Sequence, residues 1–148
     1  MKNKIPPPVV TLICALLIYL SKSLFPELTF NYSNQLCLFF LISGFSIILI
    51  SFQTFKKEKT TINPIKIEKA TSLVTSGIFK YSRNPMYLGM VLILISTAIK
   101  FSLYGGVFVI GFFVYFITIF QILPEEKAMQ KLFGEDFTNY KNKTRRWF

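Results

Sequence analysis

Two short clusters of polar residues border apolar segments of this chain and could carry chemistry. The first is the run Arg83-Asn84-Pro85-Met86-Tyr87-Leu88-Gly89, and the second is the pair Glu125-Glu126, which ends the next apolar segment. Ionisable side chains so close to lipid hydrocarbon are costly to place, so function is the default hypothesis for both clusters.

The first cluster has the features of a helix start that attracts an anion. Pro85 suits the first position of a helix, which would make Asn84 the N-cap. The free amides of that turn favour an anion, and Arg83 offers a bidentate fork for a carboxylate or phosphate. Gly89, on nearly the same face as Pro85, would let a flat ligand approach the backbone. The alternative is a capped helix with Arg83 on lipid phosphate, Tyr87 in the interfacial belt and Gly89 at a helix contact.

The two glutamates also have a purely structural interpretation. Acidic residues in a first helical turn after Pro124 are stabilised by the helix dipole whether or not they bind a ligand. If the two preceding apolar segments form a hairpin, Glu125 and Glu126 return beside Arg83, Asn84 and Tyr87. A carboxylate there could accept both hydroxyls of a ribose, or it could simply pair with Arg83.

The composition predicts one integral membrane domain over residues 1–148. The chain is 52% hydrophobic and contains 17 Phe, which is too apolar for an ordinary soluble protein. Its net charge of +10 fits nucleic acid or an anionic membrane, and the hydrophobicity favours membrane lipid, with no nucleic-acid partner. The chain has no His, so we predict no metal site and expect any base to be Glu, Asp, Tyr, Lys or Cys. Cys14 and Cys37 lie in apolar stretches, so no disulfide is predicted.

The apolar segments predict an all-α fold, because segments this few and short cannot close a membrane barrel. We expect four transmembrane helices, at about 8–25, 35–55, 85–101 and 104–123. Gly105-Gly106, with Lys100 and Ser102 nearby, is predicted to reverse the chain between the last two.

The distribution of positive charge predicts the orientation of these spans. All but two of the 17 Lys and Arg precede the first span, separate the second from the third or follow the fourth; the exceptions are Lys22 and Lys100. The positive-inside rule therefore places both termini in the cytoplasm, and we expect a multi-pass protein of the inner (plasma) membrane. We interpret the first span as retained, because no small-residue cleavage site follows it.

The cytoplasmic segments are expected to lie at the membrane interface. The loop 56–84 is too polar to insert fully, and its mixture of apolar and Lys residues suits shallow insertion into an anionic leaflet. In the tail 124–148, Pro124 can open a short helix, Gly134 can end it and a second can follow. The final Arg145-Arg146-Trp147-Phe148 is interpreted as an aromatic and cationic anchor.

Several blocks in a fixed order carry a resemblance to a known family. They are the run 73–89, Pro124-Glu125-Glu126, Phe133-Gly134, Tyr140 and Arg146-Trp147. Together they resemble the isoprenylcysteine carboxyl methyltransferase family and its bacterial relatives, and the phospholipid methyltransferases are similar over the same core. The start Ile5-Pro6-Pro7-Pro8 also resembles many bacterial members.

The resemblance implies a membrane enzyme that uses S-adenosylmethionine, held between the last two transmembrane helices and the tail. It implies that the cofactor is bound by Thr75, Ser76, Gly77, Arg83, Asn84, Tyr87, Leu88, Gly89, Glu125 and Glu126. Of these residues, Arg83, Tyr87 and Glu125 would be catalytic. The family's motif has His at the position of Asn84, and the prenylcysteine enzymes carry Arg near the neutral Gln121, which disfavours a prenylcysteine substrate here.

The expected activity is methyl transfer to a small amphipathic or lipidic acceptor at the cytoplasmic face. A carboxylate acceptor is already ionised, whereas a protonated amine must first lose a proton to a base. Because the chain has no His to serve as that base, the sequence weakly favours a carboxylate acceptor. A phospholipid amine N-methyltransferase, a nicotinamide-dependent membrane reductase and a non-enzymatic scaffold remain alternatives. The sequence leaves open the acceptor, O-, N- or S-methylation, the base and the oligomeric state.

Overall fold

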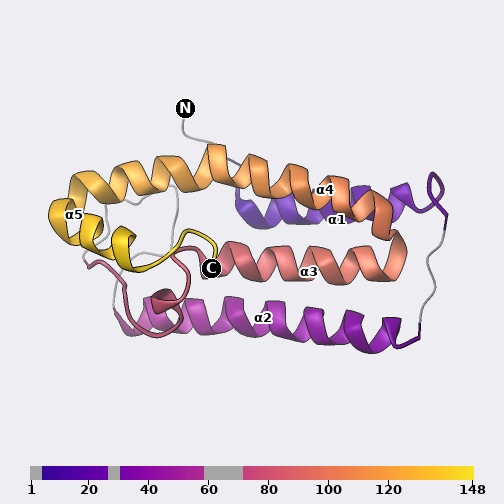
Figure 1. Cartoon of the computed structure of the whole chain (residues 1–148), viewed down its shortest axis with the longest axis horizontal. Coiled ribbons are helices and arrows are strands. Elements are labelled where there is room, and N and C mark those ends of the chain that lie inside the picture. Colours follow the sequence, from indigo (N-terminus) through magenta and orange to yellow (C-terminus); the bar gives the residue numbers. More distant parts are fainter. Residues whose placement is uncertain (1–4, 27–30, 59–71) are drawn as a thin grey trace.

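The computed structural model describes residues 5–26, 31–58 and 72–148, and these residues form helices and no strands (Figure 1). The elements in chain order are α1 (Pro7–Ser21), α2 (Ser33–Lys57), the 3-10 turn η2 (Gly77–Lys80), α3 (Pro85–Phe101), α4 (Leu103–Ile117), the π-helical turn η3 (Thr118–Ile122) and α5 (Leu123–Lys143).

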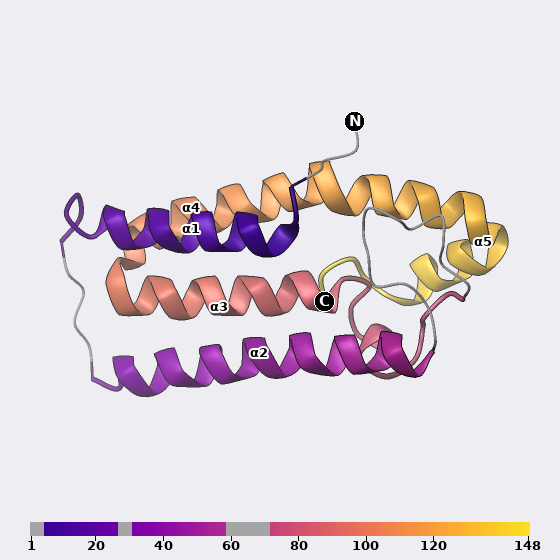
Figure 2. The same cartoon turned by 180° about the vertical axis from the view of Figure 1, so that it is seen from behind.

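The four apolar helices run side by side, and α3 lies at the centre of the bundle. It packs against α2, α1 and α4, while α1 also packs against α4 (Figures 1 and 2). The chain reverses direction between α3 and α4, and α5 continues α4 beyond the bundle before folding back. The C-terminus therefore lies beside the start of α3 (Figure 1).

The helix positions agree closely with the apolar segments of the sequence, and α3 covers the predicted 85–101 to the residue. Among the described residues, α2 and the continuous helical run Leu103–Lys143 are long and apolar enough to cross a membrane. The helices α1 and α3 have 15 and 17 residues, which is shorter than the ~20 residues of a full span. Thus two of the four predicted spans have the required length.

The reversal between α3 and α4 differs from the prediction, because Ser102 makes it and the two glycines do not. Ser102 is extended, and its hydroxyl caps α4 by accepting a hydrogen bond from the Gly105 amide. Gly105 and Gly106 lie inside the first turn of α4, where a Cβ would collide with the side chains of Ser21 and Ala98. These glycines allow α4 to approach its neighbours closely.

Pro124 also differs from the prediction, because it opens no separate helix. The helical run continues from α4 through η3 into α5. The Leu123 amide donates to the Thr118 carbonyl, a π-type bond that widens the turn before the proline. Gly134 does end the first half of α5, as predicted, with φ 50° and ψ −115°.

Two apolar clusters hold these elements together. The larger joins α1, α3, α4 and η3 through Val10, Cys14, Ile18, Tyr87, Met90, Leu94, Ala98, Phe113, Ile117 and Ile122, and Trp147 of the tail packs against it. The smaller joins η2 to α5 through Val74, Phe79, Phe137 and Tyr140. Cys14 and Cys37 are free, as predicted. The part of the predicted interfacial loop at 59–71 lies outside the described residues.

Candidate active site

The hairpin of α3 and α4 brings the two polar clusters of the sequence together at one end of the bundle. The Tyr87 hydroxyl donates to Oε1 of Glu125 at 2.6 Å, and Nη2 of Arg83 pairs with Oε1 of Glu126 at 2.7 Å. Arg83 lies two residues before the start of α3, and both glutamates lie in the first turn of α5. The predicted neighbourhood is therefore confirmed.

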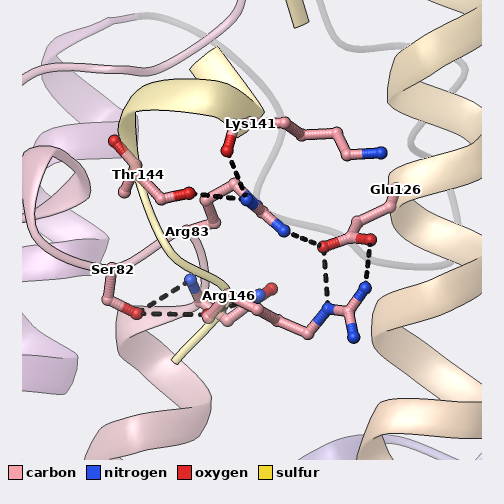
Figure 3. A network of polar contacts seen from close by, with 7 residues as sticks. Ser82, Arg83, Glu126, Lys141, Thr144 and Arg146 are labelled. Carbon is pink, nitrogen blue, oxygen red and sulfur yellow. Dashed lines mark hydrogen bonds and ion pairs between the residues drawn. The ribbon is translucent and has the colours of Figure 1, made fainter. Parts of the chain in front are cut away.

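A third charged residue, Arg146 of the tail, completes this site (Figure 3). Its Nε donates to Oε1 of Glu126 at 3.0 Å and its Nη2 donates to Oε2 at 2.9 Å. Glu126 thus lies between two guanidinium groups, and the side chains of Arg83 and Glu126 are only 9% and 12% exposed. Such paired charges with several hydrogen bonds hold a carboxylate in one orientation.

Arg83 also binds the tail through main-chain carbonyl oxygens. Its Nη1 donates to the carbonyl oxygens of Lys141 and Thr144, and its backbone N–H donates to the carbonyl oxygen of Arg145. Its Nε is buried and has no hydrogen-bond partner among the described residues. A buried donor without an acceptor is costly, so this atom marks a place where an acceptor from a ligand would be stabilised.

Asn84 occupies the predicted N-cap position, but its side chain does not cap the helix. Its Nδ2 instead donates to the carbonyl oxygen of Arg146 at 3.0 Å, and its backbone N–H donates to the hydroxyl oxygen of Ser82. The predicted N-cap position is therefore confirmed, but the side chain makes no cap bond, because the returning tail offers a carbonyl acceptor that the sequence around Asn84 does not reveal. Pro85 is at the helix start, as predicted.

Glu125 has an environment that favours protonation. The pKa of its carboxyl is raised to about 7, mainly by burial and also by the charge of Glu126, although the hydrogen bond from Tyr87 lowers it. Its Oε2 has no hydrogen-bond partner among the described residues. Glu125 can therefore gain or lose a proton near neutral pH and still has an oxygen free to accept a hydrogen bond.

Glu126 has the opposite tendency. Burial raises the pKa of its carboxyl, but hydrogen bonds from Arg146 and Arg83 and their positive charges outweigh burial, so the net shift is downward. The hydrogen bond to Glu126 in turn raises the pKa of Arg146. The pKa values of the two adjacent carboxyls are thus shifted in opposite directions: Glu126 stays ionised, and Glu125 titrates near neutral pH. This arrangement is typical of sites in which one carboxyl stabilises charge and the other transfers a proton.

Of the loop residues predicted to approach the cofactor, Ser76 and Gly77 lie beside the end of α2. The hydroxyl of Ser76 donates to Oε1 of Glu58 at 3.0 Å, and Gly77, with φ 57°, faces the side chain of Thr54. Thr75 is exposed. In the described residues, none of these three contacts Arg83, Glu125 or Glu126 by a hydrogen bond. They are linked to the site indirectly, through η2 and the tail.

Two contacts make that indirect link. The Tyr140 hydroxyl donates to the Phe79 carbonyl at 2.6 Å, and the Thr144 hydroxyl donates to the Lys80 carbonyl at 3.3 Å. Burial raises the pKa of Tyr140, so it remains a donor at neutral pH. The tail is therefore bound both to η2 and to the start of α3.

Gly89 and Leu88 complete the predicted set. A Cβ at Gly89 would lie 2.7 Å from the Gly44 carbonyl oxygen and from Cγ1 of Ile48, both in α2. Gly89 thus has the helix-packing role that the sequence left open. Leu88 is half-buried, one residue after the tyrosine that binds Glu125.

Sequence reasoning missed the role of the tail. Arg146 was interpreted as a lipid anchor, yet it binds Glu126, and the buried Tyr140 and Thr144 bind the loop. The only signal was the presence of Tyr140 and Arg146 among the blocks of the resemblance. The buried Gln121 donates to the carbonyl oxygen of Ile5 at 3.0 Å, which fixes the start of α1 to η3.

Comparison with the sequence models of protein families gives a match over most of the chain. The sequence model of the phospholipid methyltransferase family matches residues 33–136, which include Arg83, Tyr87, Glu125 and Glu126 and end before Arg146. Searches of curated proteins and of solved structures found no match. Because the matched region covers most of the chain, this protein belongs to the phospholipid methyltransferase family, and methyl transfer is the chemistry that this membership implies.

Proposed function

We propose that this protein transfers a methyl group from S-adenosylmethionine to a small amphipathic or lipidic acceptor at the cytoplasmic face of a membrane. The observation that supports this most is the convergence of Arg83, Tyr87, Glu125 and Glu126 at one end of the bundle. Family membership and two long apolar helices together indicate membrane association.

The residues of the site fit S-adenosylmethionine by their hydrogen-bonding capacity. The cofactor carries a carboxylate that needs donors and ribose hydroxyls that need acceptors. Arg83 has a buried Nε without a partner, and Glu125 has a free Oε2, among the described residues. We propose that Arg83 and Glu125 bind the cofactor directly, with Asn84, Tyr87 and Leu88 forming the adjoining wall.

The other expected cofactor residues have a less direct part in this proposal. Glu126 is held by two arginines, so we propose that it sets the position and charge of the site. Gly89 lets α3 approach α2. Thr75, Ser76 and Gly77 could reach the cofactor only from the side of the loop, since Ser76 and Gly77 contact α2.

S-adenosylmethionine supplies an activated methyl group, and the protein has to align the acceptor with it and exclude water. The apolar surfaces of α2 and α4 are largely exposed, which would place them against lipid. A lipidic acceptor could therefore approach sideways from the membrane, while the charged end of the bundle faces the aqueous side where the cofactor is dissolved.

A phospholipid amine is a second candidate acceptor, and Glu125 favours it. An ammonium group must lose a proton before its nitrogen can form a bond to the methyl carbon, as the carbon–sulfur bond breaks. Glu125, with its carboxyl pKa near 7 and a hydrogen bond from Tyr87, could accept that proton. The absence of His therefore no longer favours a carboxylate acceptor over an amine, because Glu125 could serve as the base.

The proposal is tested with purified protein in lipid nanodiscs and methyl-labelled S-adenosylmethionine. Candidate lipids and amphipathic acids or amines are incubated and then analysed by mass spectrometry for a gain of one methyl group. We expect transfer by the wild-type protein and loss of transfer in Glu125→Gln. Binding of a nicotinamide dinucleotide in place of S-adenosylmethionine would instead identify a reductase, and binding of neither would favour a scaffold.

A further inference from the structure

The tail segment that follows α5 is built into the site although it lies beyond the region matched by the family. The match ends at residue 136. Arg146, ten residues further on, contributes two side-chain hydrogen bonds to Glu126. Its carbonyl oxygen accepts hydrogen bonds from Asn84 and from Ser82. The main chain of Arg146 therefore binds the cluster that contains Arg83 and Asn84, and its side chain binds Glu126 of the second cluster (Figure 3).

The hydrogen-bonding capacity of Glu126 shows how completely its position is fixed. A carboxylate offers about four acceptor positions on its two oxygens. Oε1 accepts from Arg83 and from Arg146, and Oε2 accepts from Arg146. About one position is left, on Oε2. The planar guanidinium of Arg146 binds both oxygens of the carboxylate, which fixes the plane of the carboxylate as well as its distance from the guanidinium.

Without Arg146, Glu126 would keep one partner among the described residues, Nη2 of Arg83. A single hydrogen bond leaves the carboxylate free to rotate, and the Arg83 guanidinium would then be held firmly only at Nη1, by the carbonyl oxygens of Lys141 and Thr144. The Nε of Arg83, which has no partner among the described residues, lies in the same guanidinium group. The orientation of that donor therefore depends on the Glu126 contact as well as on the two tail carbonyl oxygens that bind Nη1.

We propose that Arg146 is a positioning residue for the methyl donor: it fixes the Glu126 carboxylate, which in turn fixes the Arg83 guanidinium toward the cofactor. This inference rests on the function proposed above. It also gives Arg146 a specific role on the tail side of the site, in place of the lipid-anchoring role that the sequence suggested for it.

Arg145 provides a matched control, because it has the same charge at the adjacent position. Arg145 is exposed, and its side chain makes no ion pair with any described residue, whereas the Arg146 side chain is 35% exposed and paired. A general loss of positive charge from the tail would affect both residues alike. Loss of the Glu126 contact would affect Arg146 alone.

The test is calorimetric titration of S-adenosylmethionine into the full-length protein in nanodiscs. Loss of a charge-assisted, bidentate contact predicts that Arg146→Ala binds roughly tenfold to a hundredfold more weakly. Arg146→Lys should recover part of that loss, because one ammonium can bind one oxygen, and Arg145→Ala should bind as the wild type does. In a methylation assay, Arg146→Ala should raise the KM for S-adenosylmethionine more than it lowers kcat.

A double-mutant cycle separates positioning from a general effect on folding. If Arg146 acts through Glu126, Arg146→Ala should add little further loss of affinity to Glu126→Gln. Thermal unfolding of each variant is measured alongside, and Arg146→Lys carries the comparison if Arg146→Ala does not fold. Wild-type affinity in Arg146→Ala, or full additivity in the cycle, would overturn the inference and leave the proposed function intact. A wild-type protein that does not bind S-adenosylmethionine would overturn both.

Discussion

The Tyr87 hydroxyl and Oε1 of Glu125 lie 2.6 Å apart although 38 residues separate them in the chain. The contact joins the first turn of α3 to the first turn of α5, because the α3–α4 hairpin returns the chain to the start of α3. The tyrosine ring belongs to the larger apolar cluster, while its hydroxyl reaches the carboxyl that we propose binds the methyl donor. One side chain thus couples the packed core to the site.

Replacing Tyr87 should separate these two contributions. Tyr87→Phe keeps the buried ring but removes the hydrogen bond, so we expect a modest loss of cofactor affinity and a folded protein. Tyr87→Ala also leaves a cavity and should destabilise the fold by about 3 kcal/mol or more. Titration calorimetry and thermal unfolding in the same detergent measure the two effects. Equal losses of affinity in both variants would reject a packing role for the ring.

Cofactor binding should depend on pH near neutrality. Glu125 has a pKa of about 7, raised mainly by burial, and only its ionised form offers both oxygens as acceptors. Between about pH 8 and about pH 6, affinity for S-adenosylmethionine should therefore fall roughly tenfold. Calorimetry across this range checks the prediction, and Glu125→Gln should give weak binding that varies much less with pH. A flat profile in the wild type would contradict the assigned role.

The two glutamates should affect stability in opposite directions. The pKa of Glu125 is higher in the folded protein than its ordinary value, so its protonated form contributes stability that is lost as pH rises through about 7. Glu125→Gln should therefore raise the melting temperature at about pH 8.

The pKa of Glu126 is lowered, so its ionised form contributes stability that is present above its ordinary pKa and lost as pH falls. Glu126→Gln should thus lower the melting temperature at neutral pH. Thermal unfolding of the two variants side by side measures the contrast, and shifts of the same sign would argue against the pairing of Glu126 with the two arginines.

The α2–α3 contact should be sensitive to an added methyl group at Gly89. A Cβ there would lie 2.7 Å from the Gly44 carbonyl oxygen, so the helices must separate, at a cost of roughly 1–3 kcal/mol. Gly111→Ala in α4 is the matched control, because a Cβ at Gly111 meets nothing within 4 Å. Thermal unfolding should show a drop for Gly89→Ala only. An unchanged melting temperature would mean that the two helices are less closely packed than described.

Much of the fold could be predicted from the sequence, because apolar length and proline position determine where helices begin and end. Pro85 at the start of α3 is the clearest case. The neighbourhood of Arg83 and the glutamates followed from the same reasoning, since a hairpin returns the end of its second helix to the start of its first.

The particular pairings could not be predicted. Adjacent residues on a helix point about 100° apart, and the π-helical turn η3 shifts the helical register of the residues that follow it. This turn helps decide that Glu125 faces Tyr87 while Glu126 faces Arg83, yet the sequence gives no clear sign of it. Asn84 and Arg146 were also beyond local reasoning, because their partners lie 62 and 20 residues away.

Titration calorimetry of the full-length protein in nanodiscs tests the central claim most directly, with S-adenosylmethionine and a nicotinamide dinucleotide as separate ligands. The wild type and Arg145→Ala should bind S-adenosylmethionine and not the dinucleotide, and Glu125→Gln should bind it much more weakly while remaining folded. Unchanged affinity in Glu125→Gln, or no binding of S-adenosylmethionine by the wild type, would contradict the assignment of this site to a methyl donor.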